Sequence, residues 1–166
     1  MQPSAYVSRE ARLRSSALVG TGSSPAWRKG RPTVVIAEDD PVYLHLLSQI
    51  AISAGWFVIP ASDAMQAVMF CVRQDPTCVM LDVNMPGGSG MVALQRLRAN
   101  TKTRNLPVLV VTGSPTAALE TQARAQGVRQ FLAKPVDPFT LQAAMQAIWE
   151  EKCATSSSSV PTAHPG

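Results

Sequence analysis

The sequence predicts a doubly wound α/β sandwich, in which one parallel sheet lies between two layers of helices. Short apolar, β-prone runs alternate five times with stretches of helical periodicity between about residues 32 and 152. Residues that start and stop helices separate these stretches, with Pro or Asp before a helix and Gly after it. Five βα units joined by right-handed crossovers form three layers. We expect the strand order 2-1-3-4-5.

The helices are recognised from their caps and apolar faces. Pro41 stands at an allowed first-turn position, Ser62 or Asp63 can cap the second helix, and Gly127 closes the fourth. The first helix has an apolar face of Tyr43, Leu46, Leu47 and Ile50. The fourth has little to anchor it beyond Ala118, Leu119 and Ala125. The expected elements, strand and helix in turn, are 33–37, 41–54, 57–60, 62–73 with its cap, 78–82, 90–99, 106–111, 115–126, 128–133 and 138–152.

Polar side chains stand at the ends of four of the five expected strands. The carboxyl ends of parallel strands meet at one edge of an open sheet, where ligands bind. The sequence therefore predicts an acidic pocket that also contains a hydroxyl and an ammonium group. Its residues are Glu38, Asp39 and Asp40 after the first strand, Asp82 at the end of the third, Thr112 after the fourth and Lys134 after the fifth.

This arrangement resembles the receiver domain of two-component response regulators over about residues 32–151. That family shows an acidic pair, a phosphoacceptor Asp, a Thr or Ser and a Lys-Pro pair after its first, third, fourth and fifth strands. The intervals here, 43, 30 and 22 residues, are those of the family. The resemblance implies a flavodoxin-like fold. The matching residues are Glu38-Asp39, Asp82, Thr112 and Lys134-Pro135.

Crowded carboxylates favour a hard divalent cation with oxygen ligands, and Mg²⁺ suits such a site. By resemblance, Asp39 and Asp82 bind Mg²⁺ directly, Glu38 acts mainly through water, and Asn84 contributes its backbone carbonyl. Asp40 is a weaker candidate ligand.

The resemblance also implies that Asp82 accepts a phosphoryl group from a sensor histidine kinase or a histidine phosphotransfer protein. Thr112 and Lys134 would then bind the phosphoryl oxygens, Phe131 would act as the switch aromatic, and Pro135 is a candidate for a cis peptide bond. The expected output is contact with a downstream protein through the fourth helix, the fifth strand and the last helix. The protein is expected to catalyse only its own phosphorylation and dephosphorylation.

Two other functions deserve weighing. Enzymes of the haloacid-dehalogenase type also use a strand-end Asp with Mg²⁺, but they typically need a second Asp two residues later, where this chain has Asn84. A receiver-like scaffold that works without phosphorylation normally lacks part of the acidic pair, the Asp or the Lys.

Each residue of the pocket, taken alone, also has an ordinary structural interpretation, such as a helix cap or a turn. Separately, those interpretations do not predict four groups at matching strand ends.

Charge and composition define the rest of the chain. Residues 1–32 carry six basic residues and one acidic residue, whereas the remainder carries nine and ten. We expect disordered tails at 1–31, which is basic, and at 153–166, which is rich in serine. No apolar run approaches the roughly 20 residues of a membrane span. The sequence thus predicts a cytoplasmic, stand-alone receiver at 32–152, with no membrane association and no specific DNA binding.

The few cysteines and histidines indicate no further site. Cys71 and Cys78 fit small buried apolar positions, and Cys153 lies near the C-terminal tail. Three cysteines without a metal-type cluster argue against a zinc site or a disulfide scaffold. His45 could be a phosphotransfer histidine, but a surface residue on the first helix is the simpler interpretation.

Overall fold

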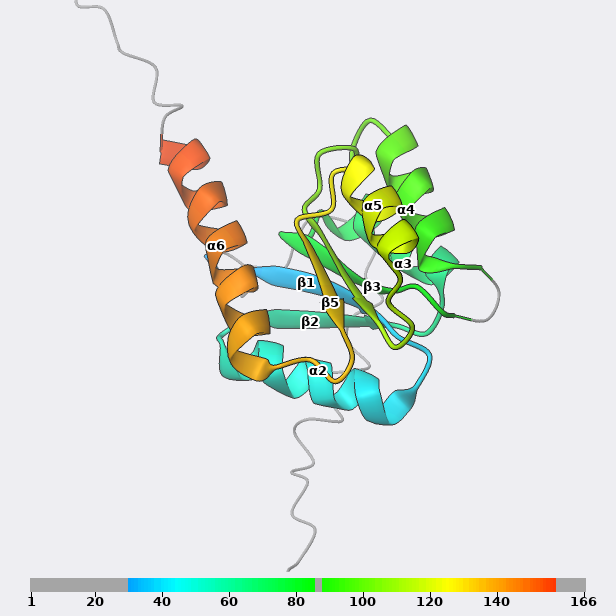
Figure 1. Cartoon of the computed structure of the whole chain (residues 1–166). Coiled ribbons are helices and arrows are strands. Elements are labelled where there is room, and N and C mark those ends of the chain that lie inside the picture. The colour runs from blue at the N-terminus through cyan, green and yellow to red at the C-terminus, as the bar shows by residue number, and fades with distance from the viewer. Residues whose placement is uncertain (1–29, 86–87, 158–166) are drawn as a thin grey trace, which may run out of the picture.

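The structure, a computed structural model, describes residues 30–85 and 88–157 (Figure 1). Its single described sheet has five parallel strands in the order β2-β1-β3-β4-β5. Both the fold class and the strand order are therefore as predicted. The strands are β1 (Thr33–Ala37), β2 (Phe57–Ala61), β3 (Cys78–Asp82), β4 (Val108–Thr112) and β5 (Gln130–Ala133).

Helices cover both faces of the sheet, as Figure 1 shows. One face carries α2 (Pro41–Ser53) and α6 (Pro138–Ser157). The other carries α3 (Ala64–Gln74), α4 (Gly90–Ala99) and α5 (Ala117–Ala125). None of the helices in the described part of the chain combines the length and the apolar character that a bilayer span requires.

The sheet divides the core into two layers. Successive residues of a strand point to opposite faces, so Val34 and Ile36 pack toward α2 and α6, whereas Val35 packs toward α3 and α4. The same alternation holds in β3, where Met80 and Leu81 belong to different layers. Both faces are covered, which explains why these strands read as continuous apolar runs rather than as alternating patterns.

The strand register places the polar strand ends together. Ala37 of β1 pairs with both Ala61 of β2 and Leu81 of β3. In the other half of the sheet, Thr112 of β4 pairs with Ala133 of β5. The residues that follow these positions must therefore emerge at one edge of the sheet, which is where the pocket was predicted.

Several details differ from the predictions: β4, α5 and β5 each begin two residues later than expected. Leu46, expected on the buried face of the first helix, is 46% exposed, while Leu44 packs against the core. Ala118 and Ala125 are exposed, and α5 is held by Leu119 and the buried Ala123. These two residues are one helical turn apart and face the same way. The light packing predicted for this helix is confirmed.

The predicted boundary at residue 152 is also wrong. Helix α6 continues to Ser157, and in its last turns the hydroxyls of Thr155 and Ser156 donate to the carbonyls of Glu151 and Lys152 one turn earlier. These bonds give the polar side chains partners within the helix, so a serine-rich composition did not mark the end of the helix. The rest of the two predicted tails, 1–29 and 158–166, lies outside the described residues.

Arg98, near the end of α4, joins three segments. Its Nε donates to the carbonyl of Gln126 at 2.7 Å, and its two terminal nitrogens donate to the carbonyls of Arg104, Leu106 and Gly127 at 2.9–3.2 Å. The rigid fork of donors in a guanidinium suits several carbonyls at once. Arg98 thereby connects α4 to the loop before β4 and to the C-terminal end of α5.

Replacing Arg98 with Lys should lower the free energy of unfolding by about 1–3 kcal/mol, because one ammonium cannot satisfy four carbonyls. Urea denaturation followed by circular dichroism measures the change. Arg96→Lys, at an exposed position on the same helix, is the matched control and should change it by less than about 0.5 kcal/mol. Equal stability of the two variants would show that the guanidinium contacts contribute nothing.

Candidate functional site

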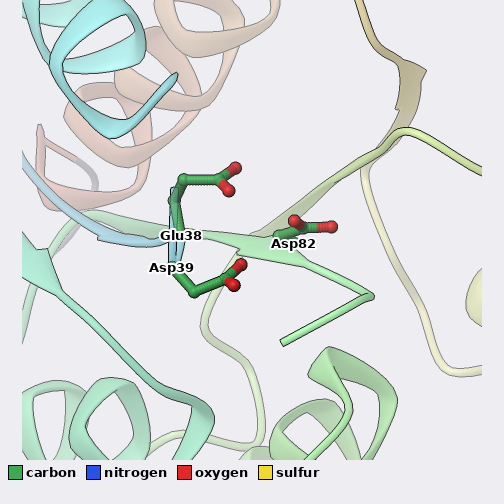
Figure 2. Close-up of side chains that lie close together, drawn as sticks. All are labelled: Glu38, Asp39 and Asp82. Atoms are coloured by element: carbon green, nitrogen blue, oxygen red, sulfur yellow. The ribbon is translucent and has the colours of Figure 1, made fainter. Parts of the chain in front are cut away.

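Three carboxylates meet at the carboxyl edge of the sheet. Glu38 and Asp39 follow β1, and Asp82 ends the neighbouring β3, and one oxygen of each lies within 4.8 Å of the others. Figure 2 shows the three side chains gathered at these two strand ends. Glu38 and Asp82 are only 1% and 5% exposed, whereas Asp39 is open to solvent. The site thus combines two buried carboxylates with one that can be reached directly.

Lys134, just after β5, bridges the two buried carboxylates. Its Nζ lies 2.6 Å from Glu38 Oε2 and 2.9 Å from Asp82 Oδ2. The aromatic ring of Tyr43 covers the ammonium, with 4.4 Å between Nζ and the ring centroid. The lysine side chain is 18% exposed. Lys134 follows the edge strand β5, and its ammonium therefore links the ends of β1 and β3 to the end of that strand.

Burial and the ion pair act in opposite directions on the pKa values of Glu38 and Lys134. Burial raises the pKa of Glu38 above its ordinary value of 4.5, and the nearby charge of Asp82 adds to that effect, although the hydrogen bond from Lys134 opposes it. For Lys134, burial lowers the pKa, but the hydrogen bonds and charges of Glu38 and Asp82 together outweigh burial and leave the pKa raised. The ammonium is consequently held in its charged form beside the carboxylates.

The backbone around Asp82 is tightly fixed. The amide of Asn84 donates to Asp82 Oδ1 at 3.1 Å, and the amide of Gly90 donates to the carbonyl of Val83 at 3.1 Å. A Cβ atom at Gly90 would lie 2.1 Å from the carbonyl oxygen of Asp82. Only glycine allows α4 to approach this strand end so closely. Sequence reasoning missed Gly90, whose signal is a poor helix former directly after the cap Ser89.

The remaining predicted residues lie around this centre. Thr112 is fully buried, and its Oγ1 accepts a hydrogen bond from the amide of Ser114 at 3.2 Å. Phe131 is partly buried and packs against the core layer between the sheet and the helices α3, α4 and α5. The peptide bond between Lys134 and Pro135 is cis, as predicted. The structure thus brings Thr112 and Lys134 to the predicted edge, while movement of Thr112 and Phe131 stays a prediction.

Other candidates have structural roles. Asp40 caps α2 by accepting from the amides of Val42 and Tyr43, which explains its presence without a metal. His45 is an exposed residue of α2. Burial raises the pKa of the Cys71 thiol to about 12 and also raises that of Cys78, so neither favours the thiolate that metals and oxidants require.

Comparison with known proteins agrees with this geometry. The model of the response regulator receiver domain family matches residues 34–146. The chain belongs to this family. The matched region includes β2 to β5 in full, β1 except for Thr33, and every residue of the pocket.

Individual relatives extend the comparison. Protein PilH of Pseudomonas aeruginosa is 29% identical over 115 residues, which are 69% of this chain and 95% of PilH. The DNA-binding dual master transcriptional regulator RpaA of Synechocystis sp. is 31% identical over 70% of this chain, but the match spans only 48% of RpaA. The matched region thus makes up nearly all of PilH but only about half of RpaA.

One of the similar solved structures contains a metal ion. The receiver domain of the sensor histidine kinase PA1611 from Pseudomonas aeruginosa is 25% identical, with a TM-score of 0.66 over 71% of this chain and 97% of that domain. That structure has a magnesium ion coordinated in its active-site cleft.

The raised pKa of Glu38 leads to a test without metal. A carboxyl whose pKa is raised by folding contributes stability below its ordinary value of 4.5, and this contribution is lost as the pH rises through the folded value. In a chelating buffer, the unfolding free energy of the wild type should therefore decrease, relative to that of Glu38→Gln, as the pH is raised. The lowered pKa of Asp137, caused by its bonds to Thr140, acts equally in both proteins.

Urea denaturation at several pH values between 4 and 8 measures this difference. Glu150→Gln, at an exposed position, is the control and should follow the wild type. Parallel curves for the wild type and Glu38→Gln would mean that ionisation of Glu38 costs no stability.

Proposed function

We propose that this receiver accepts a phosphoryl group on Asp82 from a sensor histidine kinase or a histidine phosphotransfer protein. The observation that carries the proposal is the position of this carboxylate, at the end of a buried strand and 2.9 Å from the Lys134 ammonium. A nucleophile needs a fixed geometry and access to its reagent. Asp39, beside Asp82, is exposed to solvent, so a phosphodonor would approach from this side.

In the proposed reaction, an oxygen of Asp82 attacks the phosphorus in line with the leaving group. The bond from phosphorus to the donor's nitrogen or oxygen breaks, and the leaving group keeps the electron pair. Phosphoryl transfer depends mainly on alignment and charge stabilisation. Lys134 would interact with the transferred oxygens, and the product would be an aspartyl phosphate.

The donor set fits Mg²⁺. Three carboxylates within reach of one another are hard oxygen ligands, and Mg²⁺ commonly binds one or two carboxylates together with phosphoryl oxygens. Asp39 and Asp82 would hold the ion, with the backbone carbonyl of Asn84, and Glu38 would act through water. When bound, the ion neutralises charge on the phosphoryl oxygens.

The proposed output follows from the lightly packed α5. Hydrogen bonding of Thr112 to the new phosphoryl oxygens would draw the loop after β4 inward and leave room for Phe131 to turn toward the core. The surface formed by α5, β5 and α6 would change shape and bind a downstream protein. We further propose that the protein works in the cytoplasm and catalyses only its own phosphorylation and dephosphorylation.

Intact-mass analysis after incubation with acetyl phosphate and Mg²⁺ tests the assignment of the acceptor. The wild type should gain one phosphoryl group that is stable in acid and labile in base, as expected of an acyl phosphate. Asp82→Asn should gain none, since an amide is a poor nucleophile. Full labelling of Asp82→Asn would place the acceptor elsewhere.

The proposed metal ligands have a separate test. Asp39→Ala should weaken Mg²⁺ binding by at least about tenfold, because it removes a charged ligand, and isothermal titration calorimetry measures the affinity. Asp40→Asn is the matched control, because Asn caps a helix as well as Asp does, and its affinity should stay near that of the wild type. An unchanged affinity in Asp39→Ala would exclude Asp39 as a ligand.

A further inference from the structure

Tyr43 of α2 makes two contacts with the segment that follows β5. Its hydroxyl oxygen accepts a hydrogen bond from the amide of Val136 at 3.0 Å. Its ring faces the ammonium of Lys134, with 4.4 Å between Nζ and the ring centroid. A single side chain of the first helix therefore contacts both the functional lysine and the backbone two residues after it.

The ring provides the ammonium with a third neighbour. Two carboxylate oxygens, on Glu38 and Asp82, accept hydrogen bonds from Nζ, and the electron-rich face of the tyrosine attracts the same cation. The ring also covers the ammonium, whose side chain is only 18% exposed. Charges that are shielded from water interact more strongly with their partners.

A flexible lysine needs such a constraint. Its ammonium is a compact charge on a four-carbon stem with several rotatable bonds. The backbone of Lys134 is fixed by its amide, which donates to the carbonyl of Thr112 at 2.8 Å, but this contact does not determine where Nζ lies. The groups around Nζ are the carboxylates of Glu38 and Asp82 and the ring of Tyr43, and of these only the ring is not an acid that a metal or a phosphoryl group could occupy.

The hydroxyl has a different role. Val136 is buried, and its amide would lose its partner if the hydroxyl were removed, which costs stability. The ring and the hydroxyl thus act on different properties, the first on the position of the charge and the second on the stability of the loop. An aliphatic side chain at position 43 could fill the space but would provide neither contact.

We propose that Tyr43 is a positioning residue for phosphoryl transfer, because its ring holds the Lys134 ammonium beside Asp82. This inference rests on the proposed function. It predicts that the aromatic ring, rather than the hydroxyl, determines how fast Asp82 is phosphorylated.

Three variants separate the two contacts. With acetyl phosphate and Mg²⁺, Tyr43→Leu should be labelled about threefold to tenfold more slowly than the wild type, as expected for loss of a partly shielded cation–π contact. Tyr43→Phe keeps the ring, so its rate should stay within about twofold, while its thermal midpoint should fall because the bond to Val136 is lost. His45→Ala, at an exposed position on the same helix, should match the wild type in both measurements.

A second measurement needs no phosphodonor. The chain has four lysines, so the carbon-13 NMR spectrum of protein labelled at lysine Cε is simple to assign. The ε protons of Lys134 should be shifted upfield by the tyrosine ring, and this shift should persist in Tyr43→Phe and vanish in Tyr43→Leu. The wild-type spectrum alone keeps the inference testable if Tyr43→Leu does not fold.

The outcomes distinguish failure of the proposed function from failure of the role inferred for Tyr43. Failure of the wild type to be labelled would overturn the proposed function, and this inference with it. Normal labelling of the wild type with an equal rate for Tyr43→Leu would overturn the inference alone. A rate for Tyr43→Phe as low as that of Tyr43→Leu, or a Lys134 signal without the upfield shift, would also overturn it.

Discussion

The ion pairs of Lys134 with Glu38 and Asp82 connect three strands at the point where the chemistry is expected. Two carboxylates on adjacent strands repel each other when both are ionised, and burial increases the cost of their charges. A cation beside them offsets this cost, so the lysine keeps the pocket compact without a metal. Under the proposed function, the same ammonium would also interact with a phosphoryl group on Asp82. One ammonium beside three carboxylates leaves the pocket rich in negative charge, which is why a divalent cation is proposed to share the site with a phosphoryl group.

The packing around this centre is uneven. On one side, Gly90 lets α4 lie directly against the backbone of Asp82, and the strand register leaves little freedom for the strand ends. On the other side, α5 has a single buried residue, Ala123, and Arg98 secures only its C-terminal end. A helix held at one end and lightly packed elsewhere is a natural element to move between two states. Its N-terminal end follows the loop after Thr112, where a phosphoryl group would act.

Sequence patterns predicted the sheet and its strand order. They also predicted the members of the pocket, because the carboxyl ends of parallel strands converge and four of the five strands are ended or followed by polar residues. They could not predict contacts between distant segments. Tyr43 was assigned only to an apolar face, since its partners lie more than 90 residues away. Gly90 and Arg98 were missed because their roles depend on close approach and on free carbonyls. The helical period also could not tell that Leu46, rather than Leu44, faces solvent.

The central claim is that phosphorylation of Asp82 acts through Thr112 and Lys134 on α5 and β5. Amide NMR spectra with Mg²⁺, recorded before and after addition of the phosphoryl mimic beryllofluoride, test it most directly. We expect shifts at Asp82, Thr112 and Lys134 that continue along α5, through Phe131 and into the facing part of α6. Shifts confined to the loops around Asp82, with α5, Phe131 and α6 unchanged, would contradict the account.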